Sequence, residues 1–593
     1  MAHDQLTKGV RLCSTIAAQG DGCQGARADD RTWWRGARQE VGMASTEAGG
    51  SQLFVRQSTG LVREASALDA TIYNAVFSAP VGATLAWGVF FALSAFPGAD
   101  LVWATIISFV LNIPVLIMMA LLASSMPRTG GDYVWVSRIL SPPLATISNF
   151  GAALSAMIGA TFWARYFPVF ALGPVLVVLG VIFGNDSLTS WGTSFQKDQL
   201  WIFIGGFAMI ALMTVIHIAG VRTTFRWQNV FWIIASVGTF LAFVVLLIGS
   251  NADFVKNFTA LNTKFGGGDA AAVIAGAKAQ GAAPNVGNVD ATLPTVFAIM
   301  VFMMWNWWSV YLAGELRSAA NRGRQLSIMF GALIWDVVFI VIGVLLLFKV
   351  TGYDFMVAVN TVTDAASGAI AGGAYAIPSG PWYHFMASLV FNIPVVTILI
   401  VGSFLFWSLP AMVGNTFMPI RTVFAWAFDR LLPEKFTEVN TRTHSPVPAI
   451  LLVMGLVTLM LAWSILSTDF ATWLALGVLA GVVCVVIVGV AAFVFPDRRP
   501  DLYRASPANV SWGGIPVLKI VAPLSILVML FLTYLTIRYP ALALYGDAKN
   551  VWWIPAFMGG IVVIGLVVYY GARMIRRSQG VDLDLVYREL PPE

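Results

Sequence analysis

Residues 100–125 read DLVWATIISFVLNIPVLIMMALLASS, and no charged side chain follows Asp100 in this stretch. A helix of about 20 mostly apolar residues crosses the hydrocarbon core of a bilayer. The stretch is therefore predicted to be a transmembrane helix. The same criterion, applied outward along the chain, predicts twelve spans, at residues 69–95, 100–125, 145–183, 199–220, 229–250, 293–315, 326–348, 384–428, 447–465, 468–496, 516–538 and 551–574.

The composition of the whole chain supports a membrane protein. Of its 593 residues, 58% are hydrophobic and 11% are charged, whereas soluble globular proteins carry about 25% charged residues. The basic residues are scattered at the ends of apolar runs and form no stripe, which argues against nucleic-acid binding. The three cysteines form neither a CxxC motif nor an even-numbered framework. We therefore expect no disulfide framework, no metal site and no cofactor.

Lys and Arg concentrate in alternate loops, which predicts the orientation of the chain in the bilayer. The loops on the Arg-rich side carry Arg128, Arg138, Arg222, Arg226, Arg317, Arg322, Arg324, Arg430, Lys435, Arg442, Arg498, Arg499 and Arg504. Both termini lie on that side and are therefore predicted to be cytoplasmic, with the protein in the plasma membrane.

The spans and loops divide the chain into six segments. They are a cytoplasmic tail (1–68), spans 1 to 5 (69–250), an external Gly/Ala-rich loop (251–292), spans 6 to 10 (293–496), spans 11 and 12 (497–574), and a cytoplasmic tail (575–593). Residues 1–42 have no apolar segment of the kind found in a signal peptide. They are interpreted as a dispensable extension, with a regulatory tail as the alternative.

The first span contains a candidate helix break, Ser78-Ala79-Pro80-Val81-Gly82. Pro80 removes a backbone donor and Gly82 tolerates unusual dihedral angles. Interrupted helices persist at membrane depth where they line a protein cavity, and secondary transporters bind substrate and ions there. The segment is a candidate substrate site, with a simple proline kink as the alternative.

The sixth span carries a cluster of aromatic and amide side chains, Trp305, Asn306 and Trp307. The Asn306 amide can hydrogen-bond a polar solute, and indole faces attract an ammonium group. These three residues are candidates for substrate binding. Aromatic packing or an interfacial belt is the alternative.

Two motifs follow the second and eighth spans. Residues 126–140 read MPRTGGDYVWVSRIL, and residues 419–452 begin PIRTVFAWAFDRLLPEKF. The first matches P-x-x-G-G-x-Y, and the second has Arg421, Asp429 and Pro433 at spacings of eight and four. The chain, from about residue 60 to 575, resembles the amino acid–polyamine–organocation (APC) superfamily of permeases.

The resemblance implies an all-α, leucine-transporter-type fold, with spans 1 to 5 and 6 to 10 as inverted repeats. It also implies a small-molecule substrate, an amino acid or related amine, held between spans 1 and 6 and moved by alternating access. Members with well-understood sites have a Gly-rich break in the first span, where this chain has Pro80. A bulkier, decarboxylated or modified solute is therefore the alternative to an ordinary α-amino acid.

Two ionisable residues lie inside predicted spans, Arg165 in the third and Asp336 in the seventh. A charge at the bilayer centre costs about 2.5–3.5 kcal/mol on insertion scales, so such residues are functional candidates. Arg165 could pair with a substrate carboxylate. A structural salt bridge, for example to Asp336, or snorkelling of Arg165 at the outer rim is the alternative.

Glu315, Arg421 and Asp429 lie near the inner ends of helices. The two acids are expected to form ion pairs with arginines that gate or hold the inward face. His217 is read as a satisfied buried histidine, with a proton-carrying role as the alternative.

The coupling ion is not determined by these patterns. Some proton-coupled relatives of the APC superfamily carry a Lys in the fifth span, but no Lys or Arg occurs between Arg226 and Lys256. Ser78, Asn415 and Thr416 are candidates for a sodium site. Sodium symport, proton symport by another carboxylate and exchange all remain open. The sequence does not determine the oligomeric state.

Three other classes of protein fit the sequence less well. A nucleobase or sodium–solute transporter of the same fold is disfavoured by the two motifs. A membrane-embedded enzyme would need a nucleophile–base cluster, but the four histidines are dispersed, at positions 3, 217, 384 and 444. A sensor would need an appended signalling domain. We therefore predict a secondary transporter and no enzyme.

Overall fold

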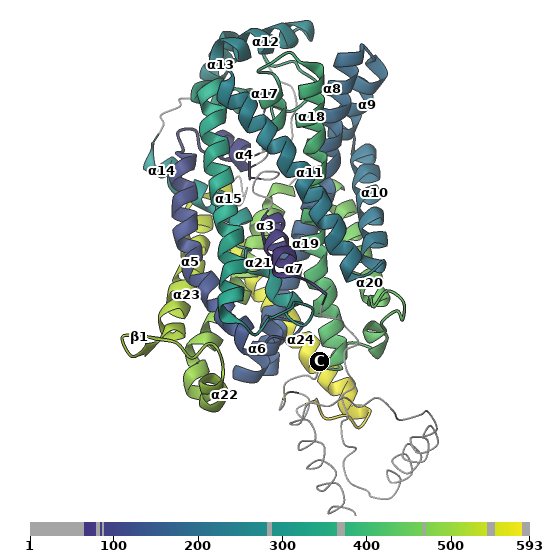
Figure 1. Ribbon diagram of the computed structural model, residues 1–593, viewed down its shortest axis with the longest axis vertical. Coiled ribbons are helices and arrows are strands. Elements are labelled where there is room, and N and C mark those ends of the chain that lie inside the picture. The colour runs from purple at the N-terminus through teal and green to yellow at the C-terminus, as the bar shows by residue number, and fades with distance from the viewer. Residues whose placement is uncertain are drawn as a thin grey trace, which may run out of the picture. The chain divides into compact units, whose positions relative to one another are not determined.

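The computed structural model describes residues 64–78, 84–85, 88–281, 287–363, 374–466, 470–542, 552–583 and 587. In this part of the chain the fold is almost entirely α-helical (Figure 1). The described helices include eleven that are long and apolar enough to cross a membrane. They are α5 (Leu101–Ser125), α7 to α8 (Pro142–Phe183), α10 (Gln199–Ile218), α11 (Val221–Ile248), α14 to η3 (Val289–Leu312), α15 (Arg322–Thr351), α18 to α19 (Pro394–Phe428), α20 (Val447–Leu466), α21 (Phe470–Arg498), α23 (Val517–Arg538) and α24 (Trp553–Ser578).

The predicted first span, residues 69–95, is not among these eleven. It is described as two short helices, α3 (Ala67–Ser78) and α4 (Val89–Ala95), and each is shorter than the about 20 residues that a bilayer requires. The predicted break at Ala79, Pro80, Val81 and Gly82 lies outside the described residues, as does the side chain of Ser78. Twelve spans were predicted, and the described residues contain eleven helices that are long and apolar enough to cross a membrane.

The third span is long, as predicted. It consists of α7 (Pro142–Tyr166), a π-helical segment η2 (Phe167–Leu172) and α8 (Gly173–Phe183). Pro168 falls in the π-helical segment. Because proline has no backbone N–H, it cannot make the usual helical hydrogen bond, and a π-turn absorbs this defect without ending the helix.

The predicted start of the eighth span at residue 384 is wrong. Residues Tyr383–Ser388 form a separate short helix, α17, and a new helix α18 (Pro394–Ser403) begins at Pro394 before α19 (Leu405–Phe428). Proline suits the first turn of a helix, where its missing donor is not needed. Apolar composition alone could not separate α17 from the span.

The segment 251–292, predicted as a Gly/Ala-rich loop, contains two helices, α12 (Asn251–Lys264) and α13 (Ala270–Ala279). The side chains of Ser250 and Asp269 cap their first turns by accepting backbone hydrogen bonds. Phe254 and Phe258 are buried and pack edge-on against Phe355 of α16 (Tyr353–Thr363). Packing of this amphipathic face stabilises α12.

Short elements complete the described part. They are α6 (Asp132–Ile139), α9 (Asp186–Lys197), η4 (Glu434–Thr437), α22 (Pro500–Ala505), η5 (Pro540–Leu542), and a two-stranded antiparallel hairpin of β1 (Ser511–Trp512) and β2 (Ile515–Pro516). In the hairpin, Ser511 pairs with Pro516 and Trp512 with Ile515.

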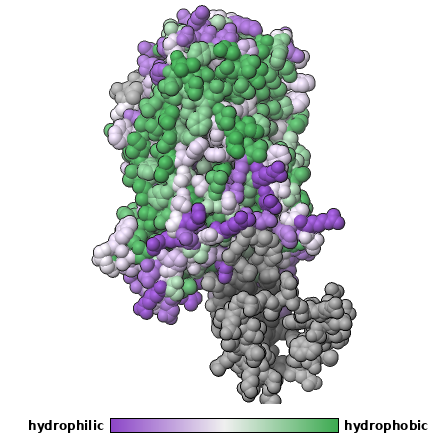
Figure 2. Space-filling view, viewed as in Figure 1, coloured by the Kyte–Doolittle hydropathy of each residue, from purple (hydrophilic) through white to green (hydrophobic). Residues whose placement is uncertain are grey.

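The surface of the helical body is apolar between two hydrophilic ends (Figure 2). On α11, for example, Ile233, Val237, Phe240, Val244 and Leu247 are exposed. Exposed apolar area of this extent is unusual on a soluble monomer and suits contact with lipid. The interior is built around α7, which packs against α19, α20, α21 and α24. The protein is therefore an integral membrane protein.

Candidate functional site

The helix of the sixth span is interrupted at the Trp305 cluster. Helix α14 ends at Met303, residues 304–307 form turns, and a 3-10 segment, η3 (Trp308–Leu312), follows. Three side-chain N–H groups donate to carbonyls near this helix end: Trp305 Nε1 to Val301 (2.7 Å), Asn306 Nδ2 to Met303 (3.1 Å) and Trp307 Nε1 to Met304 (2.8 Å). They provide partners for carbonyls that a helix end leaves exposed.

Protein surrounds this interruption. In the 18-residue apolar stretch of the sixth span, 94% is buried, which is the highest share among the eleven spans. Irregular backbone at membrane depth is tolerated where protein surrounds it. Trp305, Asn306 and Trp307, which were predicted as candidates for substrate binding, lie where the helix unwinds.

Asn74 in α3, which was not among the predicted site residues, hydrogen-bonds the far side of the interruption. Its Nδ2 donates to Ser309 Oγ over 3.0 Å, and its Oδ1 accepts from the Ser309 backbone N–H over 2.8 Å. Both residues are fully buried. Asn74 thereby provides a partner for the first turn of η3. The only signal in the sequence was an asparagine inside an otherwise apolar run.

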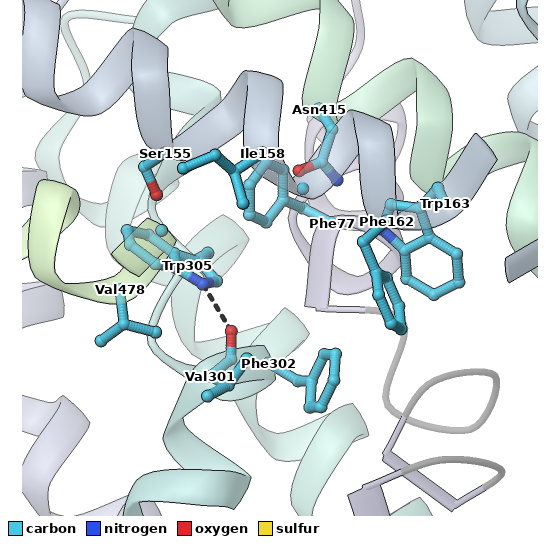
Figure 3. Close-up of a pocket in the computed structure, with 12 residues that line it drawn as sticks. Phe77, Ser155, Ile158, Phe162, Trp163, Val301, Phe302, Trp305, Asn415 and Val478 are labelled. Atoms are coloured by element: carbon cyan, nitrogen blue, oxygen red, sulfur yellow. Dashed lines mark hydrogen bonds between the residues drawn. The ribbon is translucent and has the colours of Figure 1, made fainter. Parts of the chain in front are cut away.

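An internal cavity lies beside the interruption (Figure 3). Its volume is about 40 Å³, room for roughly three water molecules at ~10–15 Å³ each. It is lined by Phe77 of α3, by Ser155, Ile158, Gly159, Phe162 and Trp163 of α7, by Val301, Phe302 and Trp305 of the sixth span, by Asn415 of α19, and by Gly477 and Val478 of α21. A solute larger than a few atoms requires these side chains to move apart.

The cavity wall is mainly apolar, with five aromatic side chains, and none of the lining residues that the structure describes is ionisable. Phe77 and Trp305 pack edge to face, with ring centroids 6.0 Å apart. Ser155 and Asn415 contribute the polar groups. Asn415 Nδ2 donates to the Ala411 carbonyl over 2.9 Å, which leaves its Oδ1 as an acceptor. Aromatic faces attract a cation, so this wall suits an ammonium group better than an anionic one.

Asn306, Trp307 and Arg165, which were also predicted to bind substrate, are not among the described residues that line this cavity. Asn306 and Trp307 are buried, and the Trp307 ring packs 4.6 Å from that of Trp308. Arg165 of α7 donates to the backbone carbonyl of Ser464 at the end of α20. Asp336 is buried within α15. Of the predicted substrate residues, Trp305 alone is among the cavity-lining residues that the structure describes.

The candidates for a sodium site point to different places. Asn415 lines the cavity. The Thr416 hydroxyl donates to the Met412 carbonyl and lies 2.8 Å from His217 Nε2 of α10. Adjacent residues on a helix do not face the same side, which explains why Asn415 and Thr416 are not brought together. His217 has a hydrogen-bond partner.

Three of the four charges that were predicted to have a gating or structural role form buried ion pairs, and the fourth is Asp336. Arg421 Nε and Nη2 donate to the two carboxylate oxygens of Glu315, over 2.5 and 3.1 Å, and both side chains are buried. The pair joins the end of the sixth span to α19. Arg138 Nη2 of α6 lies 3.5 Å from Asp429 Oδ2, and both of these side chains are also buried.

Asp132, in the P-x-x-G-G-D-Y motif, was not identified by sequence reasoning. It is fully buried and accepts hydrogen bonds from Tyr311 (2.6 Å), Ser148 (2.5 Å) and Asn149 (2.7 Å). Burial raises the pKa of its carboxyl group, although the hydrogen bonds act in the opposite direction.

The glycine before Asp132 allows this contact. Gly131 has φ +50°, and a Cβ there would lie 2.9 Å from Tyr311 Cδ1. The motif therefore packs directly against the end of the sixth span.

In the described part of the chain, eleven apolar spans accompany an interrupted helix with an apolar cavity beside it, an arrangement that suits a membrane carrier for a small solute. The chain belongs to the amino acid permease family, since the family's sequence model matches residues 70–567. This finding confirms the resemblance to the APC superfamily. It also supports secondary transport of amino acids, and members of this family are transporters and not enzymes. A search of curated proteins finds no match.

Proposed function

We propose that the cavity beside Trp305 is the amino acid site and that the protein carries its substrate by alternating access. The observation that supports this most directly is the unwinding of the sixth span at the cavity wall. Secondary transporters place substrate sites at discontinuous helices near the bilayer midplane. The leucine-transporter-type arrangement, with residues 69–95 as a twelfth span and Ser78 to Gly82 as its break, is part of this proposal.

The proposed substrate carries an amine and an uncharged side chain. Aromatic rings of Phe77, Phe162 and Trp305 suit the ammonium group. Asn415 Oδ1 is an acceptor for its N–H groups. The described lining residues offer no charged partner to a charged substrate side chain, and burial of an unpaired charge is strongly unfavourable.

A second candidate is an amine that lacks a carboxylate. Among the described residues, no guanidinium or ammonium group lines the cavity, so in this part of the wall a substrate carboxylate would be bound by backbone groups or by the Ser155 hydroxyl and Asn415 amide. Arg165, the predicted carboxylate partner, instead binds the end of α20. We propose a structural role for Arg165 in joining α7 to α20.

Substitutions in the cavity wall test this assignment. We expect Trp305→Ala and Asn415→Ala, each purified and reconstituted in liposomes, to raise the KM of uptake at least about tenfold, as the loss of a buried contact or hydrogen bond would. Trp191→Ala is the matched control because Trp191 in α9 is 56% exposed. An unchanged KM in both cavity variants would exclude the cavity as the site.

The coupling mode is open between sodium symport, proton symport and exchange. Uptake into liposomes separates the three, with an imposed sodium gradient, an imposed pH gradient, or internal unlabelled substrate. The panel includes amino acids, decarboxylated amines and a nucleobase. Uptake of the nucleobase with no response to any amino acid or amine would overturn the proposed substrate class.

The two buried ion pairs are proposed to hold the cytoplasmic face closed. Each pair, Glu315 with Arg421 and Asp429 with Arg138, joins two segments of the chain. These segments lie at the ends of the helices where Arg is concentrated. The excess of Arg at this end also supports a plasma-membrane orientation with both termini cytoplasmic. Figure 1 shows α6 and α22 at the end of the helical body opposite α12 and α13.

A further inference from the structure

The indole ring of Trp305 rests directly on the backbone of α21. A Cβ built on Gly481 would lie 2.2 Å from Trp305 Cη2 and 2.6 Å from its Cζ3. Real side-chain atoms do not approach this closely, because close-packed interiors leave no room for such overlap. The ring therefore keeps its position only while residue 481 has no side chain.

The surroundings of Trp305 restrict where its ring can go. Its Nε1 donates to the Val301 carbonyl over 2.7 Å, and its ring centroid is 5.1 Å from that of Trp308 and 6.0 Å from that of Phe77. Trp305 also lines the cavity of about 40 Å³, which is free volume next to the ring. We expect a ring displaced from α21 to move into this volume.

The opposite wall of the cavity has the same construction. A Cβ on Gly159 of α7 would lie 1.9 Å from Asn415 Oδ1. The amide on one side and the indole on the other thus each rest on a glycine of a neighbouring helix. The free volume between them depends on both glycines.

We propose that Gly481 is a specificity-determining residue that sets the size of the accepted substrate by holding Trp305 back against α21. Gly481 is a positioning residue, because it acts through Trp305. The inference rests on the proposed function, in which this cavity binds the amino acid. The chemical class it assigns is an amino acid or amine with an uncharged side chain whose upper size is limited by the Trp305 ring.

Gly481→Ala tests the inference in reconstituted liposomes. We expect the ratio of KM for phenylalanine to KM for alanine to rise by about tenfold or more, the discrimination that one methylene supports in an apolar pocket. The Trp305→Phe variant is expected to lower the same ratio below that of the unaltered protein, because the smaller ring leaves more free volume.

The double variant makes the test specific. In Gly481→Ala with Trp305→Phe, the smaller ring no longer meets the added methyl group, so the ratio should equal that of Trp305→Phe alone and not the sum of the two single effects. Two residues in contact show this kind of non-additivity, whereas independent residues do not.

Gly489→Ala is the matched control on the same helix. A Cβ there would meet Ile526 Cγ1 of α23 at 2.7 Å, so it perturbs the packing of α21 at a residue that does not line the cavity. We expect it to change the unfolding temperature without changing the KM ratio. General destabilisation of α21 is thereby separated from an effect on specificity.

The possible failures are distinguishable. If Trp305→Ala and Asn415→Ala leave every KM unchanged, the cavity is not the substrate site and both proposals fall. If they raise KM but Gly481→Ala leaves the ratio unchanged, only the role of Gly481 is overturned. If Gly481→Ala does not fold, the Trp305→Phe variant and the double variant provide the test. Equal KM ratios in these two variants and in the unaltered protein would overturn the role of Gly481.

Discussion

Asn74 and Asp132 are polar residues whose surroundings the sequence does not reveal. Each is fully buried, and each binds the sixth span, Asn74 at Ser309 and Asp132 at Tyr311. Burial of a polar group without a hydrogen bond is unfavourable. At both positions, other segments of the same chain provide the hydrogen bonds. The two residues thereby help to position the interrupted segment.

Asn74→Ala is expected to destabilise the protein by about 1–3 kcal/mol, because Ser309 is left buried with an unpaired hydroxyl and an unpaired backbone N–H. Thermal unfolding of the purified protein in detergent measures this change. Adding Ser309→Ala removes the unpaired hydroxyl and should recover part of the loss. An unfolding temperature equal to that of the unaltered protein would contradict the role of Asn74.

The raised pKa of Asp132 predicts a dependence of stability on pH. Burial raises the pKa from its ordinary value of 3.8, so the folded protein binds this proton more tightly than the unfolded chain does. The stabilisation is complete below pH 3.8 and is lost as the pH rises through the raised pKa. Asp132→Asn should remove this component from the unfolding temperature measured across the pH range.

Asp497→Asn is the control for the pH experiment. Its carboxyl group pairs with Lys519 at the surface and its side chain is 62% exposed, so the pH dependence of the unaltered protein should persist. The same pH dependence in Asp132→Asn would show that another group is responsible.

The helical elements differ in how well their ends could be predicted. The third span is continuous through Pro168 because a π-turn replaces the lost hydrogen bond. The eighth begins ten residues later than predicted, at Pro394 and not at 384. The segment 251–292 forms two helices. Hydropathy detects where apolar residues accumulate, but the start of a helix depends on caps and local packing.

The ion pair between Glu315 and Arg421 joins two of these elements, and its loss is predicted to be severe. Glu315→Gln leaves Arg421 as a buried, uncompensated charge, which destabilises by about 3–5 kcal/mol. Thermal unfolding and uptake in liposomes measure the effect. Glu434→Gln, in an exposed pair with Arg430, should have little effect. Equal stability of both variants would exclude a structural role for the buried pair.

At the scale of the whole molecule, the distribution of charge predicts which end faces the cytoplasm. The apolar surface of the helical body lies between two hydrophilic ends (Figure 2). The end with α6 and α22 carries Arg138, Arg499 and Arg504. Cytoplasmic loops of membrane proteins are enriched in Lys and Arg.

Cysteine labelling tests this orientation. In a background with Cys13, Cys23 and Cys484 replaced, a cysteine is introduced in place of Lys278 in α13 or Gln579 after α24, both exposed. We expect an impermeant maleimide to label Lys278→Cys on intact cells, and Gln579→Cys only after permeabilisation. Labelling in the reverse order would invert the proposed topology, and labelling of both on intact cells would contradict the span assignment.

The sequence by itself determined that the chain is an all-helical membrane protein, where most of its spans lie, and that it resembles the APC permeases. Those properties follow from local composition, because about 20 consecutive apolar residues are enough to specify a span. It also singled out Trp305 to Trp307 in the sixth span, but it did not determine that the helix is interrupted there. The tertiary structure alone decided which side chains meet. Asn415 lines the cavity while Thr416 contacts His217, and Trp305 rests on Gly481. These contacts join residues from 176 to 199 positions apart, and such pairings depend on how helices pack and not on the order of residues within them.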